Sequence, residues 1–177
     1  MSVPEVRIEL RPSFIDRGGV GVFAVRDISK GQKVAEGIEE SDFQNIVPWG
    51  FLEGCEPQFT RRVASFCVGT PEGFIPPPGF GFNKLSIDWY LNHSCEGNCG
   101  FDDVGDFVAI RHVNEGEELS YDYGLVESNP RFRMPCTCGS VRCRGVITGD
   151  DWKNPAFQAR NWDHMHPHLR MLIPAGA

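Results

Sequence analysis

Three cysteines lie within eight residues near the C-terminal end, in the spacing Cys136-x-Cys138-x4-Cys143. Unpaired core cysteines do not cluster at such spacing by chance, so the cluster indicates a metal site. A structural zinc site is tetrahedral and closed, and it needs a fourth protein ligand.

The seven cysteines cannot all pair in disulfides, because their number is odd. The N-terminal residues lack the pattern of a secretory signal, and no stretch approaches the ~20 apolar residues of a membrane span. We therefore expect a soluble, intracellular protein, cytoplasmic or nuclear depending on its source, whose clustered thiols bind metal. Cys55 and Cys67 are expected in core or loop positions without a metal.

With 177 residues, 41% of them hydrophobic, the chain suits a single compact domain with a real core. Its net charge of −7 argues against direct binding of nucleic acid, which needs a basic stripe. The same charge suits a basic protein or peptide partner, although it could also serve solubility alone. A membrane partner is not expected, and the oligomeric state stays open.

Short segments of alternating or β-branched residues, separated by glycine turns, predict a mainly β fold. Strands are expected at 3–10, 18–25, 33–37, 107–110 and 118–121. Helical spacing predicts a short helix over 56–66, one turn at 87–91, and a C-terminal helix over 150–163. Asp150 or Asp151 is the expected cap of that last helix, with Pro155 in its first turn. Residues 39–88 carry the weakest signals and are interpreted as a variable insert.

Two polar stretches stand out beside the cysteines. The first, Asn-His-Ser-Cys at 92–95, continues to an asparagine and a cysteine at 98 and 99. The second, at 118–124, contains Tyr121 and Tyr123, which alternation would place on one face of an extended segment. The only other tyrosine, Tyr90, precedes the first stretch. Tyrosines confined to these regions, where phenylalanine supplies bulk elsewhere, suggest hydroxyls with a function.

The glycine pair around Val20 would let the backbone approach a ligand closely, although a plain turn is the more common reason for such a pair. It lacks the third glycine and the following helix of a dinucleotide-binding fingerprint. The histidines at 164, 166 and 168 are interrupted by Pro167, so packing or a solvated tail is favoured over a metal site.

Taken in order, the glycines, Asn-His-Ser-Cys, Tyr-Asp-Tyr and the cysteine cluster resemble the SET family of protein lysine methyltransferases with a post-SET zinc segment. The resemblance covers about residues 3–147, and its one departure is Gly97, where the family usually has proline. It implies a SET-type fold of small curved β-sheets with a pseudoknot-like crossing, few short helices and a C-terminal helix. No cysteine-rich segment precedes the motifs, which resembles the compact stand-alone members.

The resemblance also implies an organisation of the chain. Residues 1–130 would form the catalytic SET domain, including the insert at 39–88. Residues 131–148 would form the post-SET zinc segment, and residues 149–177 a helical extension.

Site roles follow from the same resemblance. Contacts with S-adenosylmethionine are implied for Gly19, Val20, Gly21, Asn92, His93 and Tyr123. Tyr123 would be the essential catalytic tyrosine, with Tyr90 a further one. Tyr121 would hold a water that blocks rotation of the methylated amine, which implies mainly monomethylation. The fourth ligand of a structural Zn²⁺ would be Cys95, with Cys99 as the alternative.

The implied activity is methyl transfer from S-adenosylmethionine to a lysine of a basic protein, a histone or another. The alternative is a catalytically inactive, zinc-stabilised interaction module on the same scaffold. A zinc-ribbon nucleic-acid binder is disfavoured by the charge of −7 and by the absence of a second cysteine pair at finger spacing.

Overall fold

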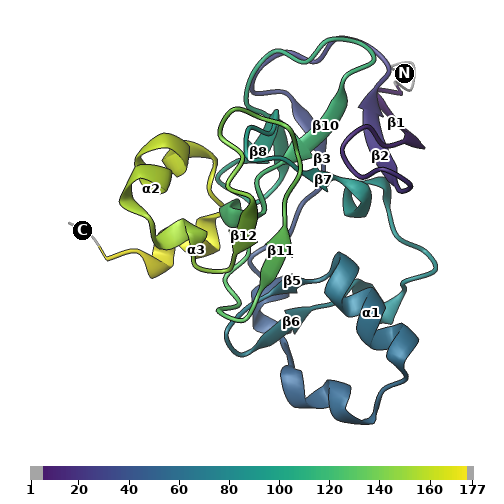
Figure 1. Ribbon diagram of the computed structural model, residues 1–177, viewed down its shortest axis with the longest axis vertical. Coiled ribbons are helices and arrows are strands. Elements are labelled where there is room, and N and C mark those ends of the chain that lie inside the picture. Colours follow the sequence, from purple (N-terminus) through teal and green to yellow (C-terminus); the bar gives the residue numbers. More distant parts are fainter. Residues whose placement is uncertain (1–5, 175–177) are drawn as a thin grey trace.

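The computed structural model describes residues 6–174, and these form a mainly β structure with short helices (Figure 1). The largest sheet has the strand order β1-β2-β10-β8-β9-β3, and β7 also pairs with β10. Its strands are β1 (Ile8–Pro12), β2 (Val20–Ala24), β3 (Lys33–Ala35), β7 (Asn92–His93), β8 (Cys99–Phe101), β9 (Phe107–Ala109) and β10 (Glu118–Tyr121). The predicted mainly β fold is confirmed. Within the described residues the first strand begins at Ile8, and residues 3–5 of the predicted strand lie outside them.

Strand β10 brings the two polar stretches of the sequence together. It runs antiparallel to β2, and parallel to β7 with the register Ser120↔Asn92 and Tyr121↔His93. The side chain of Asn98 joins the same segments, because its Oδ1 accepts from Ser120 N at 2.9 Å and its Nδ2 donates to Glu118 O at 2.9 Å. Parallel pairing of such short strands is not visible in sequence periodicity. The knot-like crossing of the chain stays a prediction.

The core lies on this sheet and is covered by the C-terminal helices. Phe101 and Leu119 of the sheet are fully buried, as are Met165 and Leu169 from the C-terminal region. Helices α2 (Pro155–Asn161) and α3 (Pro167–Leu172) form the yellow-green part at the left of Figure 1, and their Phe157 and Leu169 belong to the same buried cluster as Phe101. The C-terminal region is therefore part of the core.

The single helix predicted over 150–163 is wrong. The chain forms instead the 3-10 turn η6 (Asp151–Lys153), then α2, the 3-10 turn η7 (Trp162–His164) and α3. The cap of α2 is Asn154, whose side chain accepts from the backbone N–H groups of Ala156 and Phe157. Pro155 follows as the first helical residue, where its missing N–H is tolerated. Asp150 and Asp151 do not cap α2.

His166 caps α3 in the same way and is almost completely buried. Its Nδ1 accepts from His168 N at 3.1 Å, and its Nε2 lies 2.7 Å from Ile38 O. Burial lowers its pKa to about 4, so the ring is neutral and Nε2 carries the proton. His164 and His168 are partly buried. The expectation of packing histidines is confirmed, whereas a solvated tail is wrong for this segment.

The insert at 39–88 forms the lower part of Figure 1 and has its own small sheet, in the order β4-β6-β5. Its elements are η1 (Asp42–Gln44), β4 (Val47–Pro48), η2 (Trp49–Gly54), α1 (Pro57–Phe66), β5 (Val68–Gly69), β6 (Gly73–Ile75), η3 (Pro78–Phe80) and η4 (Ile87–Tyr90). The predicted helix over 56–66 is confirmed. The strands of two or three residues are too short to produce a periodic signal.

The remaining elements complete the fold near the cysteines. Strands β11 (Arg133–Pro135) and β12 (Val146–Thr148) form an antiparallel pair around the cysteine cluster, and η5 (Tyr123–Leu125) follows β10. Within residues 6–174, no helix is long and apolar enough to cross a membrane. The proposed domain boundaries at 130 and 148 stay predictions.

Candidate active site and metal centre

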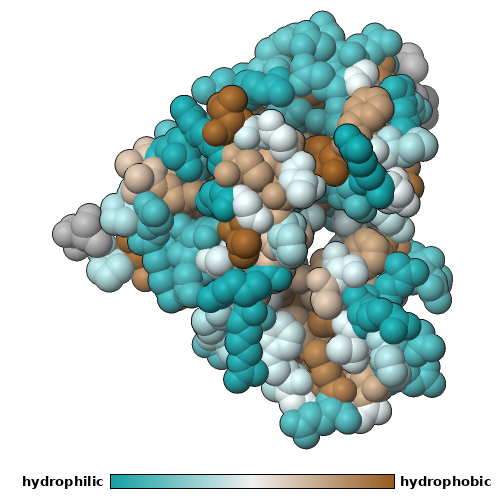
Figure 2. All heavy atoms as spheres, in the orientation of Figure 1, coloured by the Kyte–Doolittle hydropathy of each residue, from teal (hydrophilic) through white to brown (hydrophobic). Residues whose placement is uncertain are grey.

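A cavity of about 860 Å³ lies between the large sheet, the insert and the β11–β12 hairpin. Figure 2 shows a hollow between the upper part of the molecule and the lower part that contains the insert. Six predicted site residues line the cavity: Asn92, His93, Tyr121, Tyr123, Cys136 and Cys138. The predicted glycine motif at 19–21 and Tyr90 do not line it, although the neighbouring Asp16 and Trp89 do. Its volume lies in the range of small-molecule and cofactor sites.

The two tyrosines of the Tyr-Asp-Tyr motif meet at the cavity wall. Their ring centroids lie 4.9 Å apart, and Tyr121 is further packed against the edges of Phe101 and Phe107. The extended conformation predicted through Tyr123 is wrong, because β10 ends at Tyr121 and Tyr123 begins the turn η5. Burial raises the pKa of both tyrosines, so their hydroxyls stay protonated at neutral pH. The hydroxyl of Tyr123 donates to Leu91 O at 3.2 Å.

Asn92 joins the glycine turn to β10. Its amide Nδ2 lies 2.9 Å from Val20 O, 3.0 Å from Glu118 Oε1 and 3.1 Å from Ser13 Oγ. Gly21 lies against the same carboxylate, and a Cβ at this glycine would come within 2.2 Å of Glu118 Oε1. A side chain at Gly21 would therefore displace the Glu118 carboxylate that Asn92 contacts.

His93 lies between Tyr123 and the cysteine cluster. Its Nδ1 accepts from Tyr123 N at 3.1 Å, so the proton of the neutral ring resides on Nε2. Nε2 in turn lies 3.4 Å from the sulfur of Cys95. Burial lowers the pKa of His93 to about 4, despite the nearby Asp122 carboxylate, and the ring is neutral at physiological pH. This bridging position could not be inferred from the sequence.

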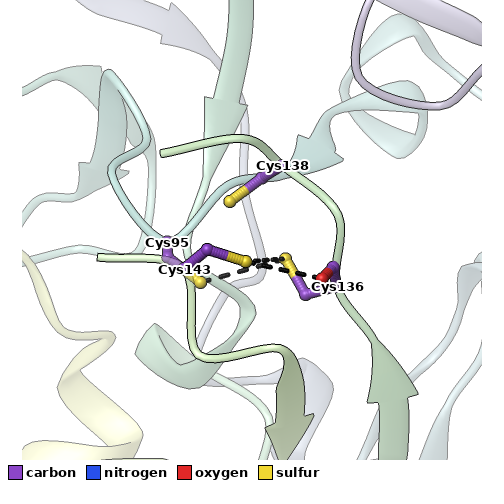
Figure 3. A group of neighbouring side chains, drawn as sticks. All are labelled: Cys95, Cys136, Cys138 and Cys143. Carbon is purple, nitrogen blue, oxygen red and sulfur yellow. Dashed lines mark hydrogen bonds between the residues drawn. The ribbon is translucent and has the colours of Figure 1, made fainter. Parts of the chain in front are cut away.

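The four predicted zinc ligands converge, as Figure 3 shows, and their sulfurs all lie within 4.8 Å of one another: Cys95, Cys136, Cys138 and Cys143. The sulfur of Cys136 is 3.9 Å from that of Cys95 and 3.7 Å from that of Cys143. Zn–S bonds of ~2.3 Å in a tetrahedron separate sulfurs by about 3.8 Å, so this donor set could bind structural zinc.

The alternative ligand Cys99 lies outside the cluster. It is fully buried in the sheet, where burial raises the pKa of its thiol to about 12. Cys55 and Cys67 also lie outside, as expected, and are partly buried. A protonated, buried thiol packs as a small apolar side chain, so Cys99 belongs to the core.

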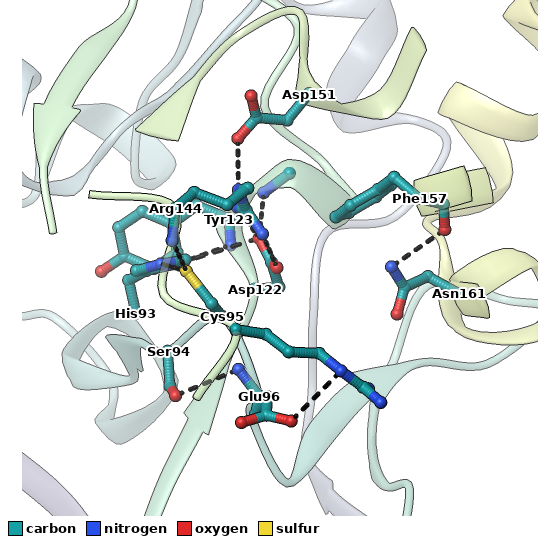
Figure 4. A network of polar contacts seen from close by, with 12 residues as sticks. His93, Ser94, Cys95, Glu96, Asp122, Tyr123, Arg144, Asp151, Phe157 and Asn161 are labelled. Carbon is teal, nitrogen blue, oxygen red and sulfur yellow. Dashed lines mark hydrogen bonds and ion pairs between the residues drawn. The ribbon is translucent and has the colours of Figure 1, made fainter. Parts of the chain in front are cut away.

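Arg144 connects the cysteine cluster to the Tyr-Asp-Tyr motif, an interaction that the sequence did not reveal (Figure 4). Its guanidinium forms two hydrogen bonds with Asp122, at 2.6 and 2.7 Å, and Nε donates to Asp151 at 2.9 Å. Its backbone N–H points at the sulfur of Cys95 at 3.4 Å, and its side chain lies over the ring of Phe157. One residue thus ties together the Tyr-Asp-Tyr motif, the cysteine cluster and the C-terminal region.

Substitution of Arg144 should destabilise the whole site. Arg144→Ala leaves the Asp122 carboxylate, whose side chain is only 7% exposed, without its cation, which should cost about 3 kcal/mol of unfolding free energy. The matched control is Arg142→Ala, because the contact of Arg142 with Glu96 is longer, at 3.6 Å, and more exposed. That change should cost about 1 kcal/mol or less. Urea unfolding of both variants measures the difference, and equal losses would contradict a special role for Arg144.

Comparison with known proteins identifies the family to which this architecture belongs. Residues 19–124, more than half of the chain, match the family model of the SET domain. The chain belongs to the SET-domain family. This SET-domain chain is 44% identical over 161 residues to histone-lysine N-methyltransferase ash1 of Drosophila melanogaster, and the match covers 80% of the chain. It is 40% identical over 151 residues to human histone-lysine N-methyltransferase 2B, covering 73% of the chain.

The SET-domain chain spans only 6% and 5% of the lengths of these two relatives. Among solved structures, it is similar to KRYPTONITE, whose crystal structure is in complex with mCHG DNA and SAH. The TM-score is 0.50 and the identity 23%, over 78% of this chain and 28% of that one. This likeness shows a SET-type fold.

Proposed function

We propose that this SET-domain protein transfers a methyl group from S-adenosylmethionine to the ε-amine of a lysine in a protein substrate. The observation that carries the proposal is the convergence of the family motifs on one cavity, where Tyr121 and Tyr123 stand beside Asn92 and His93. The names of the relatives and the presence of SAH in the related solved structure support the reaction and the cofactor. S-adenosylmethionine supplies an electrophilic methyl group to such a site.

The tyrosine pair would prepare the amine for this displacement. Packed aromatic rings exclude water, and desolvation lowers the pKa of a lysine so that more of it is neutral. The ring faces still tolerate the cationic product. Because the Tyr123 hydroxyl donates its proton to Leu91 O, its oxygen can accept a hydrogen bond from the amine and orient the nitrogen lone pair.

The charge of the cavity favours a basic substrate. Its wall carries five carboxyl groups and no lysine or arginine: Asp16, Glu36, Asp42, Asp88 and Glu127. Such a surface concentrates cationic peptides and repels anionic ones. Glu127 is the most buried of these groups, and burial raises its pKa to about 7, partly offset by hydrogen bonds from Gly69 N and Asn129 N. A histone or another lysine-rich protein is therefore the proposed substrate class.

Zinc would complete the cavity wall. The four converging cysteines would hold the ion, and the segment from Met134 to Cys138 lines the cavity beside Tyr123. Zinc binding would thereby stabilise the hairpin β11–β12 against the site.

Calorimetric titration of S-adenosylmethionine into zinc-loaded protein tests the proposal, followed by mass spectrometry of a mixed pool of basic peptides. We expect saturable binding, methylated lysine, and loss of binding in Asn92→Ala, which removes the contacts to Val20, Ser13 and Glu118. Absence of turnover with every peptide, in folded and zinc-loaded protein, would favour the non-catalytic interaction module instead.

Tyr121 is proposed to limit the reaction mainly to monomethylation, through a water held by its hydroxyl. Tyr121→Phe should raise the share of di- and trimethylated peptide, because the freed space lets the methylated amine rotate and realign. Mass spectrometry of the products measures the shares, and identical mixtures from both proteins would contradict the role. Tyr90→Phe tests the third predicted tyrosine separately, since a catalytic role for Tyr90 requires a loss of rate.

A further inference from the structure

A second hollow, of about 940 Å³, lies on the insert between α1 and the residues that follow β6. We call it the insert groove and define it by the residues that determine its chemistry: Phe59, Arg61, Arg62, Phe80, Phe82 and Lys84. The proposed methyl transfer uses none of them. The groove therefore requires an explanation of its own.

The insert groove is basic on an acidic protein. Three cations and no carboxylate line it, whereas the chain as a whole has a net charge of −7. Among residues 6–174, no ion pair joins Arg61, Arg62 or Lys84 to a carboxylate, and Arg62 lies over the ring of Phe66. Arg144 and Arg170, by contrast, are paired with aspartates. Unpaired cations that share one concave surface attract an anionic partner.

Aromatic rings supply the apolar part of the same groove. Phe59 packs against Phe80 at 5.6 Å and against the edge of Phe82 at 5.5 Å between ring centroids. Phe51 stacks parallel to Phe80 and is 49% exposed. A ligand that carries both a negative charge and an apolar or aromatic side chain matches this combination.

The insert groove continues directly from the proposed substrate cavity. Ser65 and Pro78 line both, so a polypeptide leaving the cavity across these two residues enters the groove. The charge reverses along this path, from the carboxyl groups of the cavity to the cations of the groove. Figure 2 shows the insert as a mixed surface of hydrophobic and hydrophilic residues next to the hollow.

We propose that the insert groove binds an acidic segment, with an apolar or aromatic side chain, of the same protein whose lysine enters the cavity. This inference rests on the proposed function. The substrate then has two parts, a basic stretch around the target lysine and an acidic stretch beside it. Continuity with the cavity favours this occupant over a separate partner, and Arg61 and Arg62 become residues that determine specificity.

Steady-state kinetics with three sets of lysine peptides tests the proposal. All contain the same basic stretch, extended on either side by an acidic, neutral or basic segment of equal length with one aromatic residue. We expect the KM of the best acidic peptide to be about tenfold lower than that of its neutral counterpart, as two exposed ion pairs would give, with kcat unchanged. Equal KM values for all three extensions would overturn the proposal.

Charge reversal identifies the residues responsible. Arg61→Glu with Arg62→Glu should abolish the preference for the acidic extension and lower the KM of the basic one. The neutral pair Arg61→Gln with Arg62→Gln should abolish it without inversion. Lys30→Glu with Arg160→Glu changes the net charge equally outside the groove and should keep the preference. An equal loss in this control would show a general charge effect and overturn the assignment to the groove.

Fluorescence anisotropy of a labelled acidic segment without lysine separates this inference from the proposed function. Binding that is lost in the Arg61→Glu/Arg62→Glu variant supports the groove even if no peptide is methylated. Methylation without binding of the acidic segment and without a KM preference would contradict the proposed role of the groove and would leave the proposed function intact. Tighter, salt-dependent binding of a single-stranded oligonucleotide at the same arginines would overturn the proposed occupant in favour of nucleic acid.

Discussion

Tyr123→Phe should lower kcat for methyl transfer by ~10²–10³-fold, the usual effect of removing one preorganised polar group from an active site. The change deletes only the hydroxyl that lies 3.2 Å from Leu91 O at the cavity wall, and the ring remains to pack against Tyr121. Without that oxygen, nothing at this point of the wall orients the lysine amine. Single-turnover kinetics with a saturating basic peptide measures the effect.

The control is to confirm by calorimetry and metal analysis that Tyr123→Phe still binds S-adenosylmethionine and zinc. Tyr121→Phe is the matched comparison, since it removes the neighbouring hydroxyl and should alter the products while keeping turnover. Turnover by Tyr123→Phe close to that of the unchanged protein would exclude Tyr123 as the essential catalytic tyrosine.

Loss of zinc should abolish turnover and disorder residues 134–146. Cys136→Ser removes a ligand at the centre of the cluster, with sulfurs of Cys95 and Cys143 at 3.9 and 3.7 Å. Structural zinc contributes an apparent ~10–16 kcal/mol in small zinc-binding peptides, far more than the few contacts of the β11–β12 hairpin can replace. Hydrogen exchange over the hairpin, the zinc content and the methylation rate should all change together.

Cys55→Ala is the matched control for this substitution. Its thiol lies in the insert, where it donates to Phe51 O at 3.3 Å, outside the cluster. The Cys55→Ala variant should keep one zinc per chain and its activity. A zinc-to-protein ratio near zero in active, unchanged protein would contradict the assignment of the cysteines as zinc ligands.

The site chemistry was readable from the sequence because it lies in short motifs. The four cysteines that converge, the tyrosines at the cavity and the asparagine and histidine beside them were all predicted from local spacing and resemblance. Strand β10 and helix α1 were predicted for a similar reason, since each depends on the pattern of a few consecutive residues.

The secondary-structure predictions were wrong where side chains that cap helices or turns interrupt a segment whose apolar residues are regularly spaced. The apolar anchors of 150–163 indicated one helix, yet Asn154 and His166 each cap a separate helix whose first residue is proline. A capping side chain competes with helix continuation through its hydrogen bond to the backbone, and periodicity does not include that competition. Tyr123 illustrates the same effect, because the side chain of Asp122 accepts from Gly124 N and starts a turn.

The residue types and their spacing determined the family, the metal donor set and the class of reaction proposed here, because thiolates, phenols and carboxamides have the same chemistry in any fold. The tertiary structure alone decided which distant groups meet. It placed Arg144 between Asp122 and Asp151, and a basic groove beside an acidic cavity. Such contacts join residues that are far apart in the sequence, and they depend on the register of the strands and on the packing of the hairpins. The spacing of neighbouring residues does not predict them.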